Sequence, residues 1–110
     1  MLHLERNPTL QQFQEYVATM VEERGFQDQS IFQTCLLLGE EVGELFKAVR
    51  KEEGMHIDPQ SEVGLVEGEL ADILIYCLTI ANKKNIDLET AFRKKEEINK
   101  QRTWNVNKKL

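Results

Sequence analysis

The sequence is short of the residues that bind transition metals, with only two cysteines and two histidines in 110 residues. Their spacing fits no structural or catalytic zinc site. A di-iron helical bundle would need a Glu-x-x-His pair on each of two helices. Only Glu53-Gly54-Met55-His56 has that form, and Gly54 interrupts it at an expected helix end. Zinc and di-iron centres are therefore disfavoured.

The two cysteines are also too few for a disulfide framework. Cys35 and Cys77 lie within apolar helical stretches. We expect both to be buried as small apolar side chains in a reducing compartment.

Long apolar runs and excess positive charge are absent as well. The longest apolar run, residues 70–81, is too short to cross a bilayer and contains Asp72. His3, Glu5 and Arg6 interrupt any early signal sequence, so we predict a soluble, cytoplasmic protein without a membrane segment. The net charge of −5 disfavours a nucleic-acid backbone or an anionic membrane as a partner. A nucleotide stays compatible, because a bound metal can reverse the local charge.

The length predicts a single domain, residues 1–110, and no strand alternation or repeat is present. Helical periodicity and capping residues predict four helices joined by short connections. The expected helices cover residues 9–24, 31–52, 61–82 and 87–102, followed by a polar tail at 103–110. The predicted fold is an all-α, four-helix-bundle-like chain. Because so short a chain has much surface for its volume, we expect homo-oligomerisation to complete its core.

The second expected helix carries acid next to its apolar face. Its apolar stripe consists of Cys35, Leu38, Val42, Leu45 and Val49. Glu41 and Glu44 lie on the adjacent row, one turn apart, so their carboxylates project together. Two like charges placed this way repel each other unless a cation lies between them.

The third expected helix repeats this arrangement with Glu69 and Asp72. Among 19 acidic residues, these two pairs are the only ones spaced three apart. Both pairs fall in the most hydrophobic segments, whereas a solvated charge cluster would fall in a polar one. We therefore predict that the four carboxylates face one another across a helix pair and hold a divalent metal. Oxygen-only ligands favour Mg²⁺, with Mn²⁺ as a substitute.

The fourth expected helix carries a polar, cationic face. Lys95, Asn99 and Arg102 are spaced four and three apart, so they share one side of the helix. Facing an acidic metal site, they would bind phosphate oxygens. The alternative is a solvated basic helix end that complements the helix dipole. Tyr76 lies one turn beyond Asp72 and either lines the same pocket or is a core tyrosine.

These residues resemble a known family. The pairs Glu41-Val-Gly-Glu44 and Glu69-Leu-Ala-Asp72 are similar to the ExxE…ExxD pattern of the MazG-like, all-α nucleoside triphosphate pyrophosphohydrolases. The surrounding segments LLLGEEVGELFKAVRK and ELADILIYCLTIANKKNIDLETAFRKKEEINKQRTW are similar too. The resemblance runs from about Leu10 to Trp104.

The resemblance implies a Mg²⁺-dependent hydrolase of nucleoside triphosphates, in which water attacks the α-phosphorus and releases a monophosphate and pyrophosphate. It implies that Glu41, Glu44, Glu69 and Asp72 bind metal or activate water. Members of the group form homodimers or tetramers built from dimers.

The resemblance also assigns residues to the substrate. Lys95, Asn99 and Arg102 match the family's phosphate- and nucleotide-binding positions on the fourth helix. Tyr76 matches a pocket tyrosine of the branch that acts on deoxycytidine nucleotides. Candidates for stacking on a base are Phe26, Phe32 and Trp104. Glu40, next to the motif, is interpreted as a surface or supporting acid.

Two other functions fit the same residues. A nucleotide or metal sensor would keep the site without turnover. A helical interaction module would use the acids structurally, and its stability would not respond to Mg²⁺ or nucleotide.

Overall fold

The structure, a computed structural model of the chain, describes residues 2–102. These residues form four helices and no strand, so the predicted all-α class is confirmed. The helices are α1 (Leu10–Glu23), α2 (Ile31–Glu52), α3 (Val66–Lys83) and α4 (Leu88–Lys100). Trp104 and the predicted polar tail, 103–110, lie outside the described residues.

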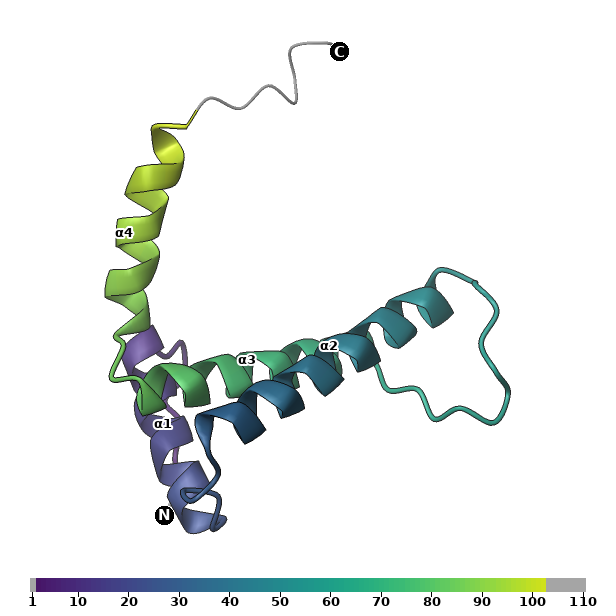
Figure 1. Ribbon diagram of the computed structural model, residues 1–110, viewed down its shortest axis with the longest axis horizontal. Helices are drawn as coiled ribbons and strands as arrows, with labels where there is room; N and C mark the ends of the chain where they lie inside the picture. Colours follow the sequence, from purple (N-terminus) through teal and green to yellow (C-terminus); the bar gives the residue numbers. More distant parts are fainter. Residues whose placement is uncertain (1, 103–110) are drawn as a thin grey trace.

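The helices are arranged around an antiparallel pair. Helices α2 and α3 lie side by side and are joined by the long loop of residues 53–65 at one end of the pair (Figure 1). At the other end α1 packs across α3, and α4 leaves the end of α3 and points away from the pair (Figure 1). Helix α4 contacts α1 near its own start. One chain therefore does not wrap α4 around the α2–α3 pair.

The first two helices begin as their sequences predict. Thr9 accepts a hydrogen bond from the backbone N–H of Gln12, and the Gln12 side chain accepts one from the Thr9 N–H. Ser30 and Gln33 form the same reciprocal pair at the start of α2. Each capping box satisfies two backbone donors that would otherwise lack a partner.

The third helix begins later than predicted. The sequence predicts that it begins at residue 61, but α3 begins at Val66, after Leu65, which makes no side-chain capping bond. Residues 58–61 form a turn instead, in which the Asp58 side chain accepts from the Gln60 N–H and the Asp58 carbonyl accepts from the Ser61 N–H. An aspartate that bonds its own downstream backbone stabilises a turn in competition with a helix start.

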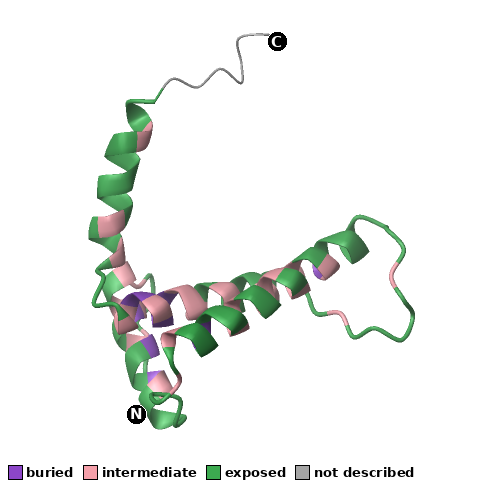
Figure 2. Cartoon of the chain, in the orientation of Figure 1, coloured by how far each residue is buried: buried purple, intermediate pink, exposed green. Residues whose placement is uncertain are grey.

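The small apolar core lies where α1 crosses α3. Val17, Met20 and Leu78 are buried there (Figure 2). Beside them the buried Gln14 amide donates to Asn82 Oδ1 at 3.0 Å and to the Ile86 carbonyl at 2.8 Å, and its oxygen accepts from the Leu88 N–H at 2.9 Å. These bonds fix the turn before α4 to α1. Within the described residues, no helix has the length and apolar character needed to cross a membrane.

Helix α2 has apolar residues on two faces, which corrects the predicted stripe. The face packed on α3 is centred near Glu41, with Thr34 and Ala48 fully buried. Cys35 and Val49, which we expected to be buried, are exposed. The predicted stripe assumed a single apolar face, and its centre lies roughly 80° around the helix from the face that is buried.

The opposite face of α2 is an exposed apolar stripe. We call it the outer stripe; it consists of Phe32, Leu36, Gly39, Gly43 and Phe46. Phe32 and Leu36 are 78% and 73% exposed. A side-chain carbon built on either glycine would meet no atom within 4 Å. Exposed apolar surface of this extent is typical of an interaction face.

Candidate functional site

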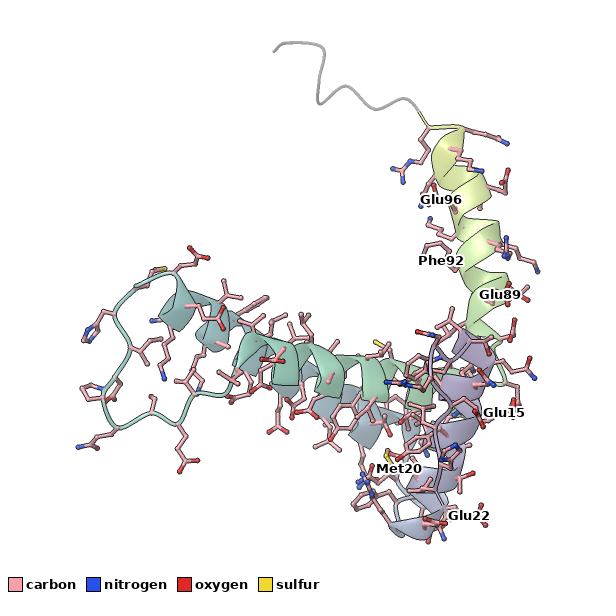
Figure 3. All side chains as sticks on the ribbon, turned by 180° about the vertical axis from the view of Figure 1, so that it is seen from behind. Glu15, Met20, Glu22, Glu89, Phe92 and Glu96 are labelled. Carbon is pink, nitrogen blue, oxygen red and sulfur yellow. The ribbon has the colours of Figure 1, made fainter. Side chains whose placement is uncertain are left out.

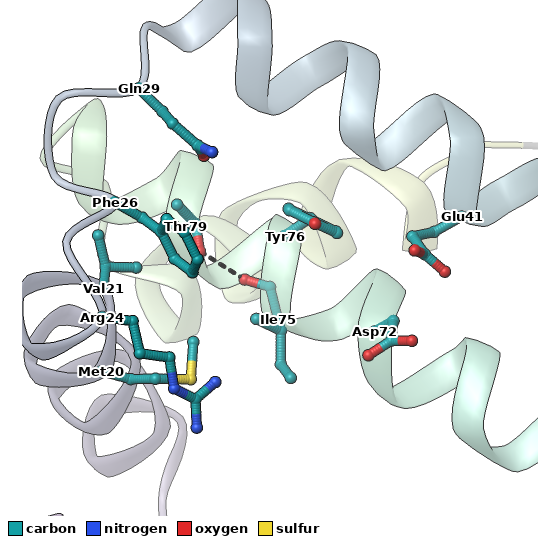
Figure 4. A pocket seen from close by; sticks show the side chains of 10 residues that line it. All are labelled: Met20, Val21, Arg24, Phe26, Gln29, Glu41, Asp72, Ile75, Tyr76 and Thr79. Atoms are coloured by element: carbon teal, nitrogen blue, oxygen red, sulfur yellow. Dashed lines mark hydrogen bonds between the residues drawn. The ribbon is translucent and has the colours of Figure 1, made fainter.

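Three of the four predicted acids come together between α2 and α3. Carboxylate oxygens of Glu41, Glu69 and Asp72 all lie within 4.8 Å of one another. Glu41 comes from the buried face of α2, and Asp72 faces it from α3 (Figure 4). Glu69 lies in the first turn of α3, where the helix dipole favours negative charge. We call these three residues the acid cluster.

The fourth predicted acid is directed elsewhere. Glu44 lies one turn after Glu41 and makes an ion pair with Lys47, with Nζ and carboxylate oxygen 3.6 Å apart. Both side chains are more than a third exposed, so this pair stabilises the helix only weakly. Glu44 is therefore near the cluster and outside it in this conformation.

The electrostatics of the acid cluster favour a bound proton or a cation. A hydrogen bond with the Glu69 carboxyl raises the pKa of Glu41 from 4.5 to about 7, and desolvation and the charges of Asp72, Glu69 and Glu44 act in the same direction. A carboxylate so placed loses its proton readily only when a cation compensates its charge. The donor set, carboxylate oxygens without sulfur or imidazole, fits Mg²⁺ or another hard divalent ion. Two ligands on opposite sides of one Mg²⁺ lie about 4 Å apart, so three oxygens within 4.8 Å of one another are near enough to share one ion after small side-chain movements.

A cleft of about 220 Å³ leads away from the acid cluster. Glu41 and Asp72 line one end, and the other end is lined by α1 and the α1–α2 connection (Figure 4). The remaining lining residues are Met20, Val21, Arg24, Phe26, Gln29, Ile75, Tyr76 and Thr79. The cleft therefore joins an anionic end to an end with an aromatic ring, an amide and a guanidinium.

Tyr76 lies between the two ends, as one of the two sequence interpretations requires. Its ring is half-buried and lines the cleft one turn after Asp72 (Figure 4). Burial raises the pKa of the Tyr76 hydroxyl, and the nearby charges of Glu41, Asp72 and Glu40 add to this effect. The hydroxyl therefore stays protonated and can donate a hydrogen bond to a ligand.

The predicted phosphate-binding residues do not meet the acid cluster within one chain. Lys95 and Asn99 lie on α4, which points away from α2 and α3 (Figure 1). Arg102 lies beyond the end of α4, because the helix ends at Lys100 and Gln101 caps it. Phe92, on the same helix, is 68% exposed and lies on the side of α4 that faces the open angle between α4 and the α2–α3 pair (Figure 3). Like the outer stripe, this part of α4 leaves apolar surface uncovered.

Several cleft residues were missed from the sequence. Phe26 was one of three aromatic candidates. Arg24 and Gln29 lie in or beside a connection, where helical periodicity gives no signal. Thr79 follows Tyr76 by three residues on the same helix, and this spacing could have identified it. Gly64 was missed as well. A side-chain carbon at Gly64 would clash with the Glu69 carboxylate, so this glycine leaves room for a member of the acid cluster. Phe32 is exposed on the outer stripe, away from the cleft lining.

Comparison with known families identifies the family of the chain. The family model described as MazG nucleotide pyrophosphohydrolase domain matches residues 29–106, which is most of the chain. The chain belongs to the MazG family. No curated protein matches it. The matched MazG region contains α2, α3 and α4, and thus all residues of the acid cluster.

Proposed function

We propose that this MazG-family protein is a Mg²⁺-dependent nucleoside triphosphate pyrophosphohydrolase that converts a ribo- or deoxyribonucleoside triphosphate to the monophosphate and pyrophosphate. The observation that carries the proposal is the acid cluster at one end of a cleft whose other end suits a base. A triphosphate would lie at the acidic end, and the nucleoside would extend toward Phe26 and Gln29. Membership of the MazG family supports the reaction class.

The proposed metal ligands are Glu41, Glu69 and Asp72, with Glu44 as a fourth once its side chain leaves Lys47. Bound Mg²⁺ would neutralise phosphate charge and lower the pKa of a coordinated water, and Mn²⁺ is the expected substitute. One carboxylate of the cluster accepts the proton of the attacking water. The Tyr76 hydroxyl donates a hydrogen bond to the substrate within the cleft.

We propose that the residues that bind the substrate phosphates come from a second copy of the chain. Lys95, Asn99 and Arg102 cannot reach the acid cluster of their own chain while α4 points away from it. A homodimer, or a tetramer built from dimers, that covers the outer stripe would bury its apolar side chains and bring a partner's α4 to the α2–α3 pair. Cationic donors would then face the phosphates opposite the metal.

The proposed setting is the cytoplasm, where the enzyme would remove excess or non-standard nucleotides from the pool. Both cysteines are free, and Cys77 is half-buried, which suits a reducing compartment. Neither nucleic acid nor a membrane is a proposed partner, in keeping with the net charge of −5.

The reaction class can be tested with a panel of ribo- and deoxyribonucleoside triphosphates, Mg²⁺ and ¹⁸O-labelled water. Attack at the α-phosphorus releases pyrophosphate and places the label in the monophosphate. Label in pyrophosphate would mean attack at the β-phosphorus, and orthophosphate with a nucleoside diphosphate would mean cleavage of the bond between the β- and γ-phosphates. Either result would contradict the proposal.

The same panel separates the two alternatives. Mg²⁺-dependent nucleotide binding without product would favour a sensor. A melting temperature that responds neither to Mg²⁺ nor to nucleotide would favour a helical interaction module.

A further inference from the structure

The far wall of the cleft is made by the connection between α1 and α2, residues 24–30. The Phe26 ring and the Gln29 side chain both face the cleft from this connection (Figure 4). The connection has no helical hydrogen-bond ladder of its own. The position of this wall therefore depends on the few bonds that hold the connection in place.

Bonds at both ends tie the connection to its own helices. Gly25, with φ of +76°, turns the chain out of α1, and the Phe26 N–H donates to the Val21 carbonyl at 2.9 Å. At the other end Ser30 is held by its capping box with Gln33. Between them, the Gln29 N–H donates to the Phe26 carbonyl at 3.1 Å. None of these bonds ties the connection to α3, across the cleft.

Lys83 makes the hydrogen bond that links the connection to α3. The last residue of α3 is half-buried, and its ammonium group donates a hydrogen bond to the Gln29 carbonyl at 2.6 Å. A charged donor makes a stronger bond than a neutral one, and partial burial strengthens it further. The bond anchors the backbone at the residue whose side chain faces the cleft.

The same face of α3 connects this anchor to the acid cluster. Asp72, Tyr76, Thr79 and Lys83 follow one another at spacings of four, three and four, so they form one stripe along the helix. The stripe begins at a cluster carboxylate, passes two cleft residues and ends at the tie to the far wall. One rigid helix of about 16 Å between Asp72 and Lys83 thus sets the separation of the two ends of the cleft.

We propose that Lys83 is a positioning residue that, through the Gln29 carbonyl, holds the Phe26–Gln29 wall at a fixed distance from the acid cluster and so determines which nucleobase fits the cleft. The proposal rests on the function proposed above, because it takes the far wall to contact the base. Lys83 itself touches neither the phosphates nor the reacting atoms. Its loss should weaken binding and base discrimination and leave the chemical step nearly unchanged.

The kinetic test compares three variants. Lys83→Met removes the donor and keeps the apolar stem, Lys83→Arg keeps a cationic donor, and Lys84→Met removes the same charge from an adjacent, exposed residue. We expect Lys83→Met to raise KM for the preferred nucleotide about tenfold, with kcat within about twofold of wild type. The ratio of kcat/KM between the best and poorest base should fall as well. Lys83→Arg should recover most of the loss, and Lys84→Met should match wild type.

A measurement without nucleotide tests the hydrogen bond between Lys83 and Gln29 directly. Hydrogen–deuterium exchange of peptides covering residues 24–30 should be faster in Lys83→Met than in wild type, and unchanged in Lys84→Met. Circular dichroism melting of each variant verifies that the whole chain still folds.

The outcomes separate the positioning role from the proposed reaction. Unchanged exchange in Lys83→Met, or unchanged KM and base ranking, would overturn the positioning role even if the enzyme hydrolyses nucleotides. A loss of kcat at constant KM would do the same, since it would show a role in the chemical step. If wild type turns over no nucleotide, the base-selecting role fails with the proposed function, and the exchange result alone decides whether Lys83 fixes the connection.

Discussion

The acid cluster and the cationic face of α4 were predicted from the same kind of helical spacing, yet one chain assembles only the first. Glu41, Glu69 and Asp72 meet because α2 and α3 are antiparallel neighbours whose buried faces carry them. Lys95 and Asn99 lie on a helix that touches α1 near its start and points away from the pair. Spacing within a helix predicts which side chains share a face, but not what that face meets.

The difference has a physical origin in how each helix is held. Helices α2 and α3 contact each other more extensively than any other pair of helices in the described residues, and this contact brings Glu41 beside Glu69 and Asp72. Among the described residues, α4 contacts α1 near its base, where the Gln14 side chain bonds Ile86 and Leu88. A site that contains both regions therefore needs a partner that packs against the exposed length of α4. The proposed partner is a second copy of the chain.

The largest effect should come from breaking the acid cluster. Glu41→Gln and Asp72→Asn each remove one carboxylate charge at nearly constant shape, so the fold should be kept. Loss of a proposed metal ligand or base should lower kcat/KM for the preferred nucleoside triphosphate by at least about 100-fold. Steady-state assays of pyrophosphate release measure this loss.

A matched control is available at the neighbouring position. Glu40→Gln removes the same charge from an exposed residue outside the cluster and should keep activity within about twofold of wild type. Equal losses of activity in Glu40→Gln and Glu41→Gln would show that activity depends on the total negative charge of this region. The acid cluster would then have no special role.

Mixing two inactive variants would show whether α4 acts on its own chain or on a partner. Glu41→Gln has a damaged acid cluster, and Lys95→Met lacks a proposed phosphate contact. If the site is shared between two chains, half of the remixed dimers are mixed and each has one intact site of two. Activity should then recover to about a quarter of the wild-type value. No recovery after verified subunit exchange would mean that α4 serves its own chain.

The outer stripe can be tested separately from catalysis. Leu36→Glu places a charge in the middle of this exposed apolar surface and should convert the oligomer to monomer, as measured by sedimentation or light scattering. Activity should fall with dissociation, because the monomer lacks a partner's α4. Glu15→Lys, an exposed charge change on α1, is the control. An active monomeric Leu36→Glu protein would exclude the shared site.

The acid cluster should also make the metal-free protein less stable as pH rises. The pKa of Glu41 is about 7 in the folded chain and 4.5 ordinarily, so the folded state binds this proton more tightly than the unfolded state. In EDTA, the contribution of Glu41 to stability should be largest below pH 4.5, fall as pH rises to 7 and then level off. Mg²⁺ should raise the melting temperature more above this interval than below it. Thermal melts across the pH range measure both effects.

Two variants test this assignment. Glu41→Gln should remove most of the slope between pH 4.5 and 7. Asp87→Asn should leave that slope intact, because hydrogen bonds from Thr90 lower the pKa of Asp87 and confine its contribution to more acidic conditions. A slope that survives in Glu41→Gln would mean that another group carries the charge repulsion.

Much of the fold could be read from local chemistry. Capping residues and apolar periodicity predicted the four helices and most of their ends, and capping boxes at Thr9 and Ser30 start the first two helices in the structure. The start of α3 was misplaced, because Asp58 bonds its own downstream backbone and makes Ser61 part of a turn. The buried face of α2 was misjudged, because an apolar outer stripe shifts the average direction of the hydrophobic residues.

The sequence predicted the site residues that lie on regular helices better than those that lie in connections. The pairs that meet in the acid cluster lie on regular helices, and Tyr76 follows Asp72 by one turn. Arg24, Phe26 and Gln29 come from a helix end and a connection, whose direction depends on tertiary bonds such as the one from Lys83. Glu44 shares a face with Glu41, but the nearby Lys47 competes for its carboxylate.

The smallest expected effect concerns Gly64, which lies in the loop before α3. Gly64→Ala adds a carbon where the Glu69 carboxylate now lies, and the flexible side chain would move aside. We expect the fold to be kept, the Mg²⁺ concentration for half-maximal activity to rise several-fold, and kcat at saturating Mg²⁺ to be nearly unchanged. Gly68→Ala is the control, because an added carbon there meets no atom within 4 Å and alanine favours a helix. Equal Mg²⁺ dependence in both variants would mean that helical spacing alone positions Glu69, and that the loop has no part in building the acid cluster.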